Sequence, residues 1–129
     1  MKEVIAPEVA EAEIDKWCER FGVTVSSADS VRIVSAIIHG RLSLDEDKEE
    51  FVYRLRRPVA LDNGKTIDEL RVHEPTAGQT RDANKNGKGN EIDTSLRLLA
   101  SITEQPLGVI ERIGLYDLTL AGALFNFFV

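Results

Sequence analysis

The sequence has little of what several common classes of protein require. It holds a single cysteine, Cys18, which excludes an internal disulfide, so the fold needs no oxidising compartment. Its first residues have neither the basic start nor the apolar core of a signal peptide. The most apolar run, residues 115–129, is shorter than the about 20 residues that a membrane-spanning helix needs, and it contains Asp117 and Asn126. These absences predict a soluble protein of the cytoplasm without membrane partners.

A basic excess is also missing. The formal net charge is −6, and the imbalance lies in residues 1–50, which hold 6 Lys and Arg against 12 Asp and Glu, whereas residues 51–129 hold 10 of each. Proteins that bind nucleic acid usually present a basic patch, because neutralised phosphates supply much of their affinity. The charge distribution argues against a nucleic-acid partner, and it ranks a winged-helix-like regulator last among the alternatives.

Motifs that carry chemistry are absent as well. There is no Gly-x-Ser-x-Gly, no Gly-x-x-x-x-Gly-Lys and no Gly-x-Gly-x-x-Gly, and Cys18 has no recognisable catalytic partner. Neither His39 nor His73 has a cysteine or a second histidine at metal-ligand spacing. We therefore expect a protein that is not an enzyme and that needs no cofactor.

What the sequence does contain is enough apolar material for one domain, with 43% apolar residues in a chain of 129. Apolar residues at helical spacing between Pro7 and Gly22 predict a first helix. A second apolar run, between Ser26 and Gly40, predicts a helix that is buried on most sides. Residues 1–50 are thus expected to form an acidic and largely helical part.

Alternating apolar residues in the segment 41–72 predict strands. Asn63-Gly64 supplies the positive φ angles of a tight turn, so we expect a small three-stranded antiparallel meander. In the last strand Ile67 and Leu70 are three residues apart and have opposite parity, so in a regular strand their side chains would point to opposite faces of the sheet. This predicts either a bulge near Asp68-Glu69 or a later start of the strand.

Beyond the strands, residues 76–90 are polar and rich in glycine, which predicts a mobile loop. Apolar spacing around Leu96 to Ile102 predicts a helix, Pro106 can open a short one, and Asp117 can cap a third that runs to the C-terminus. The predicted fold is therefore a single α+β domain with two N-terminal helices, the meander and two or three C-terminal helices.

The polar loop also has the spacing of a calcium-binding loop. The residues at positions 1, 3, 5, 9 and 12 of an EF-hand-like loop would be Asp82, Asn84, Asn86, Asn90 and Asp93. Gly89 stands where an apolar residue normally pairs with a partner loop, and no second copy of the loop exists. A solvated loop is the favoured interpretation, and a calcium-binding interaction module is the alternative.

The C-terminal end is rich in large apolar residues, with three of the chain's five phenylalanines among its last five residues. They cover more than one helical face, which is more than one small domain is expected to bury. The alternatives are a core element with a frayed end, and a patch that meets a partner chain or a second copy of this one. The predicted contact residues are Leu118, Leu124, Phe125, Phe127 and Phe128.

From Phe51 onward, short segments follow one another in an order that resembles a known family. The segments are Leu55-Arg56-Arg57-Pro58-Val59, Asn63-Gly64, Ile67-Asp68-Glu69-Leu70, Glu74-Pro75-Thr76-Ala77-Gly78, the helix around Leu96 to Ile102, Pro106-Leu107-Gly108-Val109-Ile110-Glu111-Arg112-Ile113 and Tyr116-Asp117-Leu118. In this order residues 51–129 resemble the tail assembly chaperone family of Mu-like and P2-like contractile-tailed bacteriophages and prophages. Residues 1–50 and the long polar loop depart from the family's pattern.

The resemblance implies a function in virion assembly. Such a chaperone would bind the tape measure protein in the host cytoplasm, keep it soluble, help tail tube protein polymerise around it and be absent from the finished virion. It would require neither nucleotide nor metal. The alternatives are a small structural phage protein that remains in the virion, and an adaptor module.

Overall fold

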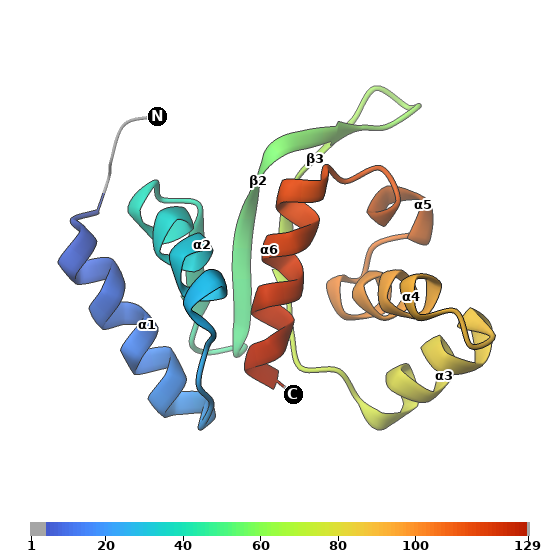
Figure 1. Ribbon diagram of the computed structural model, residues 1–129. Helices are drawn as coiled ribbons and strands as arrows, with labels where there is room; N and C mark the ends of the chain where they lie inside the picture. Colours follow the sequence, from blue (N-terminus) through green and yellow to red (C-terminus); the bar gives the residue numbers. More distant parts are fainter. Residues whose placement is uncertain (1–4, 129) are drawn as a thin grey trace.

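The computed structural model describes residues 5–128, and in it helices cover one face of a three-stranded antiparallel sheet (Figure 1). The helices α1 (Pro7–Phe21) and α2 (Ser27–Ile38) precede the strands β1 (Leu42–Asp45), β2 (Glu50–Ala60) and β3 (Thr66–Val72). The elements that follow are α3 (Ala77–Gly87), α4 (Glu91–Thr103), α5 (Leu107–Ile110), α6 (Leu115–Phe125) and the 3-10 turn η1 (Asn126–Phe128). This order confirms the predicted α+β fold.

Helix α1 begins and ends where the sequence predicts. Pro7 occupies the first turn, where its missing N–H has no intrahelical partner to lose, and Gly22 ends the helix with a φ of 67°. Ala10, Ile14 and Trp17 are buried along one face. The helix is therefore held by its apolar stripe.

Helix α2 is capped by Ser26, whose side chain accepts a hydrogen bond of 3.2 Å from the backbone N–H of Asp29. Its buried residues are Ile33, Ala36 and Ile37. The prediction that this helix is buried on most sides is wrong, because Val31 is 71% exposed. Among residues 5–128, no element covers the side of α2 that carries Val31.

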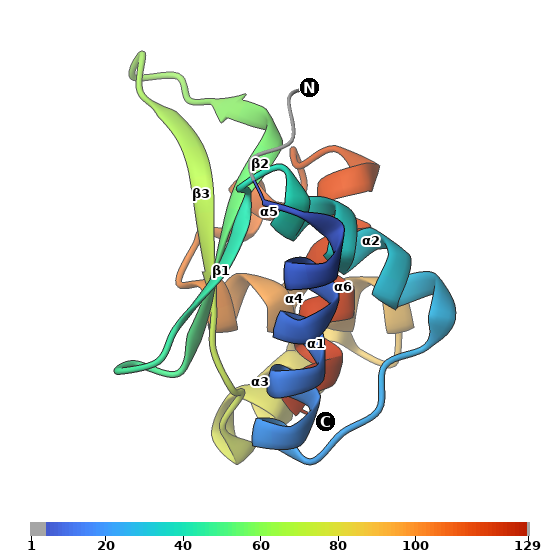
Figure 2. The same cartoon turned by 90° about the vertical axis from the view of Figure 1, so that its left-hand side faces the viewer.

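The sheet has the order β1-β2-β3, with Tyr53 of β2 opposite both Leu42 of β1 and Leu70 of β3. Figure 2 shows α1, α2 and α6 on the same side of this sheet. The side chains that face them are buried: Leu42, Phe51, Tyr53, Leu55, Leu70 and Val72. The opposite face carries charge, and there the Arg71 guanidinium lies 3.3 Å from carboxylate oxygens of both Asp45 and Glu50.

A bulge interrupts the pairing of β2 with β3. Arg54 is opposite Glu69, but the next paired residue of β2 is Val59, opposite Ile67. The extra residues belong to β2, where residues 55–58 stand opposite Asp68 alone. The register shift lies beside Asp68-Glu69, but the prediction of a bulge in the last strand is wrong, because the extra residues are in β2.

The predicted mobile loop is wrong, because residues 77–87 form helix α3. Thr76 and Gln79 make a capping box, in which the Thr76 hydroxyl accepts from the Gln79 N–H at 3.1 Å and the Gln79 side chain accepts from the Thr76 N–H at 2.9 Å. Ala83 and Gly87 are buried. A cap at one end and close packing on α4 outweigh a composition that is poor in helix formers.

Gly87 sets the distance between α3 and α4. A Cβ there would overlap Thr94 Oγ1 and lie 2.9 Å from Thr94 Cα, so one helix would have to shift. We expect Gly87→Ala to lower the free energy of unfolding by about 1–3 kcal/mol, measured by urea denaturation. Gly78→Ala is the matched control, because its Cβ would meet only Thr76 Oγ1 at 3.8 Å. Equal stability of the two variants would contradict this packing role.

The core joins the first helix to the end of the chain through aromatic rings. Phe51 of β2 lies 5.1 Å from both Trp17 and Phe127, measured between ring centroids, and Phe21 lies 5.3 Å from Phe128. Phe127 is only 2% exposed and Leu124 is fully buried. The expectation that one domain could hardly bury the apolar tail is wrong for these two residues, because α1 and β2 cover Phe127 and helix α6, which carries Leu124, packs on α2 and the sheet.

Candidate docking groove

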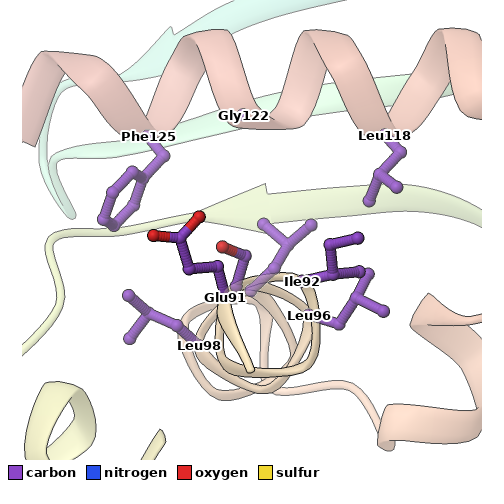
Figure 3. Close-up of a pocket in the computed structure, with 9 residues that line it drawn as sticks. Glu91, Ile92, Leu96, Leu98, Leu118, Gly122 and Phe125 are labelled. Atoms are coloured by element: carbon purple, nitrogen blue, oxygen red, sulfur yellow. The ribbon is translucent and has the colours of Figure 1, made fainter. Parts of the chain in front are cut away.

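An apolar groove lies between α4 and α6, with a volume of about 430 Å³. Figure 3 views α4 along its axis while α6 runs across the picture, so the two helices cross steeply instead of packing side by side. The groove is lined by Glu91, Ile92, Ser95, Leu96, Leu98, Leu99, Leu118, Gly122 and Phe125. We call it the α4–α6 groove.

Helix α4 supplies one wall of the groove. Asn90 caps this helix, its side chain accepting from the Asp93 N–H at 2.9 Å, and so fixes where the first turn begins. Ile92, in that first turn, is 75% exposed, while Ile102 at the other end is fully buried in the core. The helix thus has one apolar face in the core and a second at the groove.

Helix α6 supplies the other wall. Leu118 and Phe125 point from it toward α4, and Gly122 lies between them (Figure 3). A Cβ at Gly122 would meet no atom within 4 Å, so the absence of a side chain there leaves the middle of the groove open. The groove is therefore a concave apolar surface with half-buried walls.

The predicted contact residues of the tail occupy two different places. Leu118 and Phe125 line the α4–α6 groove, whereas Leu124 and Phe127 lie in the core and Phe128 is half-buried beside Phe21. Their contact with a partner stays a prediction. Sequence reasoning missed the contribution of α4. The four-residue spacing of Ile92 and Leu96, with Leu98 off the buried face, could have indicated a second apolar face on this helix.

A buried carboxylate anchors α6 to the sheet. Asp117 is 1% exposed, and its Oδ1 accepts hydrogen bonds from the Tyr53 hydroxyl at 2.6 Å and from the Arg56 N–H at 2.9 Å. Its Oδ2 accepts from the Arg57 N–H at 3.0 Å. Burial, followed by the contact with Asp117, raises the pKa of Tyr53 far above its ordinary value, so the phenol stays protonated and donates.

The anchor explains why the bulge in β2 is tolerated. Arg56 and Arg57 lie in the stretch that has lost its pairing with β3, and Asp117 receives the N–H groups of both. The Arg56 guanidinium also lies 4.0 Å from the centre of the Tyr116 ring. The prediction that Asp117 caps its own helix is therefore wrong: Gly114 is the N-cap, and Asp117 bonds to the strand instead.

The calcium-loop alternative does not fit the fold. Asp82, Asn84 and Asn86 lie in α3. Residues two apart in an α-helix are turned by about 200° about its axis, so the side chain of Asn84 points to nearly the opposite side from those of Asp82 and Asn86, and the three cannot converge on one ion. Asn90 is engaged as the cap of α4, and Asp93 forms an ion pair of 2.8 Å with Arg97. Within residues 5–128 no group of three or more His, Cys, Asp or Glu side chains is placed to hold a metal ion.

No helix that the structure describes between residues 5 and 128 has both the length and the apolarity needed to cross a bilayer.

Comparison with known proteins places these features in a family. No curated protein and no solved structure matches the chain. A family model described as phage tail assembly chaperone proteins, E, or 41 or 14, matches residues 52–129. The match includes both walls of the α4–α6 groove and the Asp117 anchor, and it leaves α1 and α2 outside. It covers more than half of the sequence, so this chain belongs to the family of phage tail assembly chaperone proteins.

Proposed function

We propose that this chaperone binds a helical segment of the tape measure protein in the α4–α6 groove. Binding there would cover apolar side chains of the tape measure protein in the host cytoplasm while tail tube protein polymerises around it. The family establishes the role in tail assembly. The identity of the partner comes from the resemblance of residues 51–129 to chaperones of contractile-tailed phages.

The observation that carries the proposal is the apolar groove itself. Ile92 is 75% exposed beside Leu96, Leu118 and Phe125, within one connected concave surface. Covering a large aliphatic or aromatic side chain contributes about 1.5–3 kcal/mol, so several such contacts can hold a partner against the entropy lost on association. Binding of a partner's amphipathic helix in an apolar groove is a recurring mode of recognition.

Chemically, the groove is suited to binding and not to turnover. Glu91 is its one ionisable residue, at the edge of α4, and the other lining residues are apolar apart from Ser95 and Gly122. Such a surface can recognise the apolar face of a helix and a cation beside it. This agrees with a chaperone that acts by covering its partner.

Two substitutions test the groove in co-expression with the tape measure protein. Ile92→Lys places a charge on the exposed wall, and Gly122→Leu fills the open centre at a helical position where no atom stands within 4 Å. We expect either variant to keep its fold and to lower the affinity for the tape measure protein by at least about tenfold, because the first puts a charge into the apolar contact and the second leaves no room for the partner's side chains. The measurement is the yield of soluble complex, followed by calorimetry on the purified pair.

Val9→Lys is the matched control, since Val9 is 57% exposed on α1, outside the groove. A tape measure protein that is equally soluble without this chain would contradict the proposal, as would full binding by both groove variants. Mass spectrometry of purified virions separates the chaperone from the alternative of a retained structural protein, because a chaperone should be missing from the particle.

A further inference from the structure

A second groove lies between α1 and α2, in the part of the chain outside the family match. Its volume is about 610 Å³, and its lining residues are Glu11, Ile14, Asp15, Ser30, Val31, Val34, Ser35, Ile38 and His39. We call it the α1–α2 groove. In Figure 1 it belongs to the pair of helices on one side of α6, whereas α4 lies on the other side.

The groove combines an apolar strip with an acidic rim. Val31 is 71% exposed, and Val34 and Ile38 continue the strip at three- and four-residue spacing along α2. Glu11 and Asp15 stand one turn apart on α1. The lining contains no lysine or arginine among the residues that the structure describes.

Neither carboxylate of the rim is neutralised within residues 5–128, where no hydrogen bond or ion pair involves the side chain of Glu11 or Asp15. The charge of Asp15 acts on its surroundings, because it adds to the effect of burial in raising the pKa of the Cys18 thiol. Residues 1–50 as a whole hold 12 Asp and Glu against 6 Lys and Arg. Helices α1 and α2 themselves hold six Asp and Glu against three Lys and Arg, so this face is negative.

We propose that the α1–α2 groove is a second docking surface and that its occupant is a basic amphipathic helix of a partner protein. The apolar face of that helix covers Val31, Val34 and Ile38. Lysine or arginine residues one turn apart on its flank meet Glu11 and Asp15. The chain then holds two partners at once, one in each groove.

The test uses the whole chain, labelled with ¹⁵N, and a synthetic amphipathic helical peptide of leucine and lysine. We expect shifted amide signals to cluster on α1 and α2 and binding to weaken as salt is added, because exposed charges are screened. A peptide of the same pattern with glutamate in place of lysine should produce no shifts. Equal binding of both peptides, shifts confined to the α4–α6 groove, or no shifts at all would overturn the proposal.

Variants assign the binding to named residues. Glu11→Gln combined with Asp15→Asn should weaken binding of the basic peptide by about three- to tenfold, as expected for two exposed charge pairs, and Val31→Lys should weaken it further. Val9→Ser is the control that should leave binding unchanged, since Val9 does not line the groove. If all of these variants bind equally, the groove is not the site. A dimer in sedimentation that Val31→Lys dissociates would assign the groove to a second copy and overturn the proposal.

Discussion

Replacing Asp117 by alanine is expected to lower the free energy of unfolding by about 3–5 kcal/mol, because the change leaves buried donors without their acceptor. The carboxylate is 1% exposed and receives the Tyr53 hydroxyl and the N–H groups of Arg56 and Arg57. These last two groups lie in the bulge and lack a partner in β3. Equilibrium denaturation in urea measures the loss.

Two companion variants separate the parts of this anchor. Tyr53→Phe removes one hydrogen bond and keeps the ring in place, so we expect a loss of about 1–2 kcal/mol. Asp117→Asn keeps the shape of the side chain but turns one acceptor into a donor that faces a backbone N–H, and its stability should fall between the other two. A loss below about 1 kcal/mol for Asp117→Ala would show that the strand satisfies its bulge without α6.

The second large effect is expected at Phe127, where alanine should cost about 3–5 kcal/mol of stability. Its ring lies 5.1 Å from Phe51 and 6.3 Å from Trp17, measured between ring centroids, and it is 2% exposed. Removing the ring would leave a cavity and would remove the contacts of Phe127 with Trp17 and Phe21 of α1. Thermal and urea unfolding measure the change.

Phe125→Ala is the control for this prediction, since Phe125 lines the α4–α6 groove and is half-buried. We expect it to reduce stability by less than about 1.5 kcal/mol while it weakens binding of the tape measure protein. Equal losses of stability at the two positions would contradict the division of the tail into core and groove. Truncating residues 125–129 would be a poor test of binding, because it removes Phe127 from the core.

The separate roles of the two phenylalanines have a simple geometric origin. Helix α6 is apolar all round, so the sequence alone does not say which residues face the sheet. The rotation of α6 is set by Asp117, which must reach Arg56 and Arg57. Two of the segments that resemble the family, Leu55 to Val59 and Tyr116 to Leu118, therefore meet in space and orient the helix.

Local patterns were sufficient for many elements of the fold. Pro7 and Gly22 bound α1, Ser26 caps α2, and Asn63-Gly64 joins β2 to β3, because each of these residues acts on the backbone beside it. The parity of Ile67 and Leu70 pointed to the right stretch of the sheet but to the wrong strand, because the extra residues are in β2.

Helix α3 shows where the local sequence pattern gave a wrong prediction. Glycine and asparagine predict a loop, but the capping box at Thr76 and the contact of Gly87 with α4 hold those residues in a helix. The contact of Gly87 depends on α4, which is its neighbour in space. The composition of residues 76–90 therefore cannot predict it.

The sequence by itself determined the fold class, the bounds of α1 and α2, the meander and the family, because caps, turns and apolar spacing are properties of consecutive residues. Only the tertiary structure decided which apolar residues of the tail are core and which line a groove. It also decided that α4 forms half of the groove and that Asp117 serves the sheet. These outcomes depend on the crossing of α4 with α6 and on the rotation of α6, which are set by packing between segments far apart in the chain.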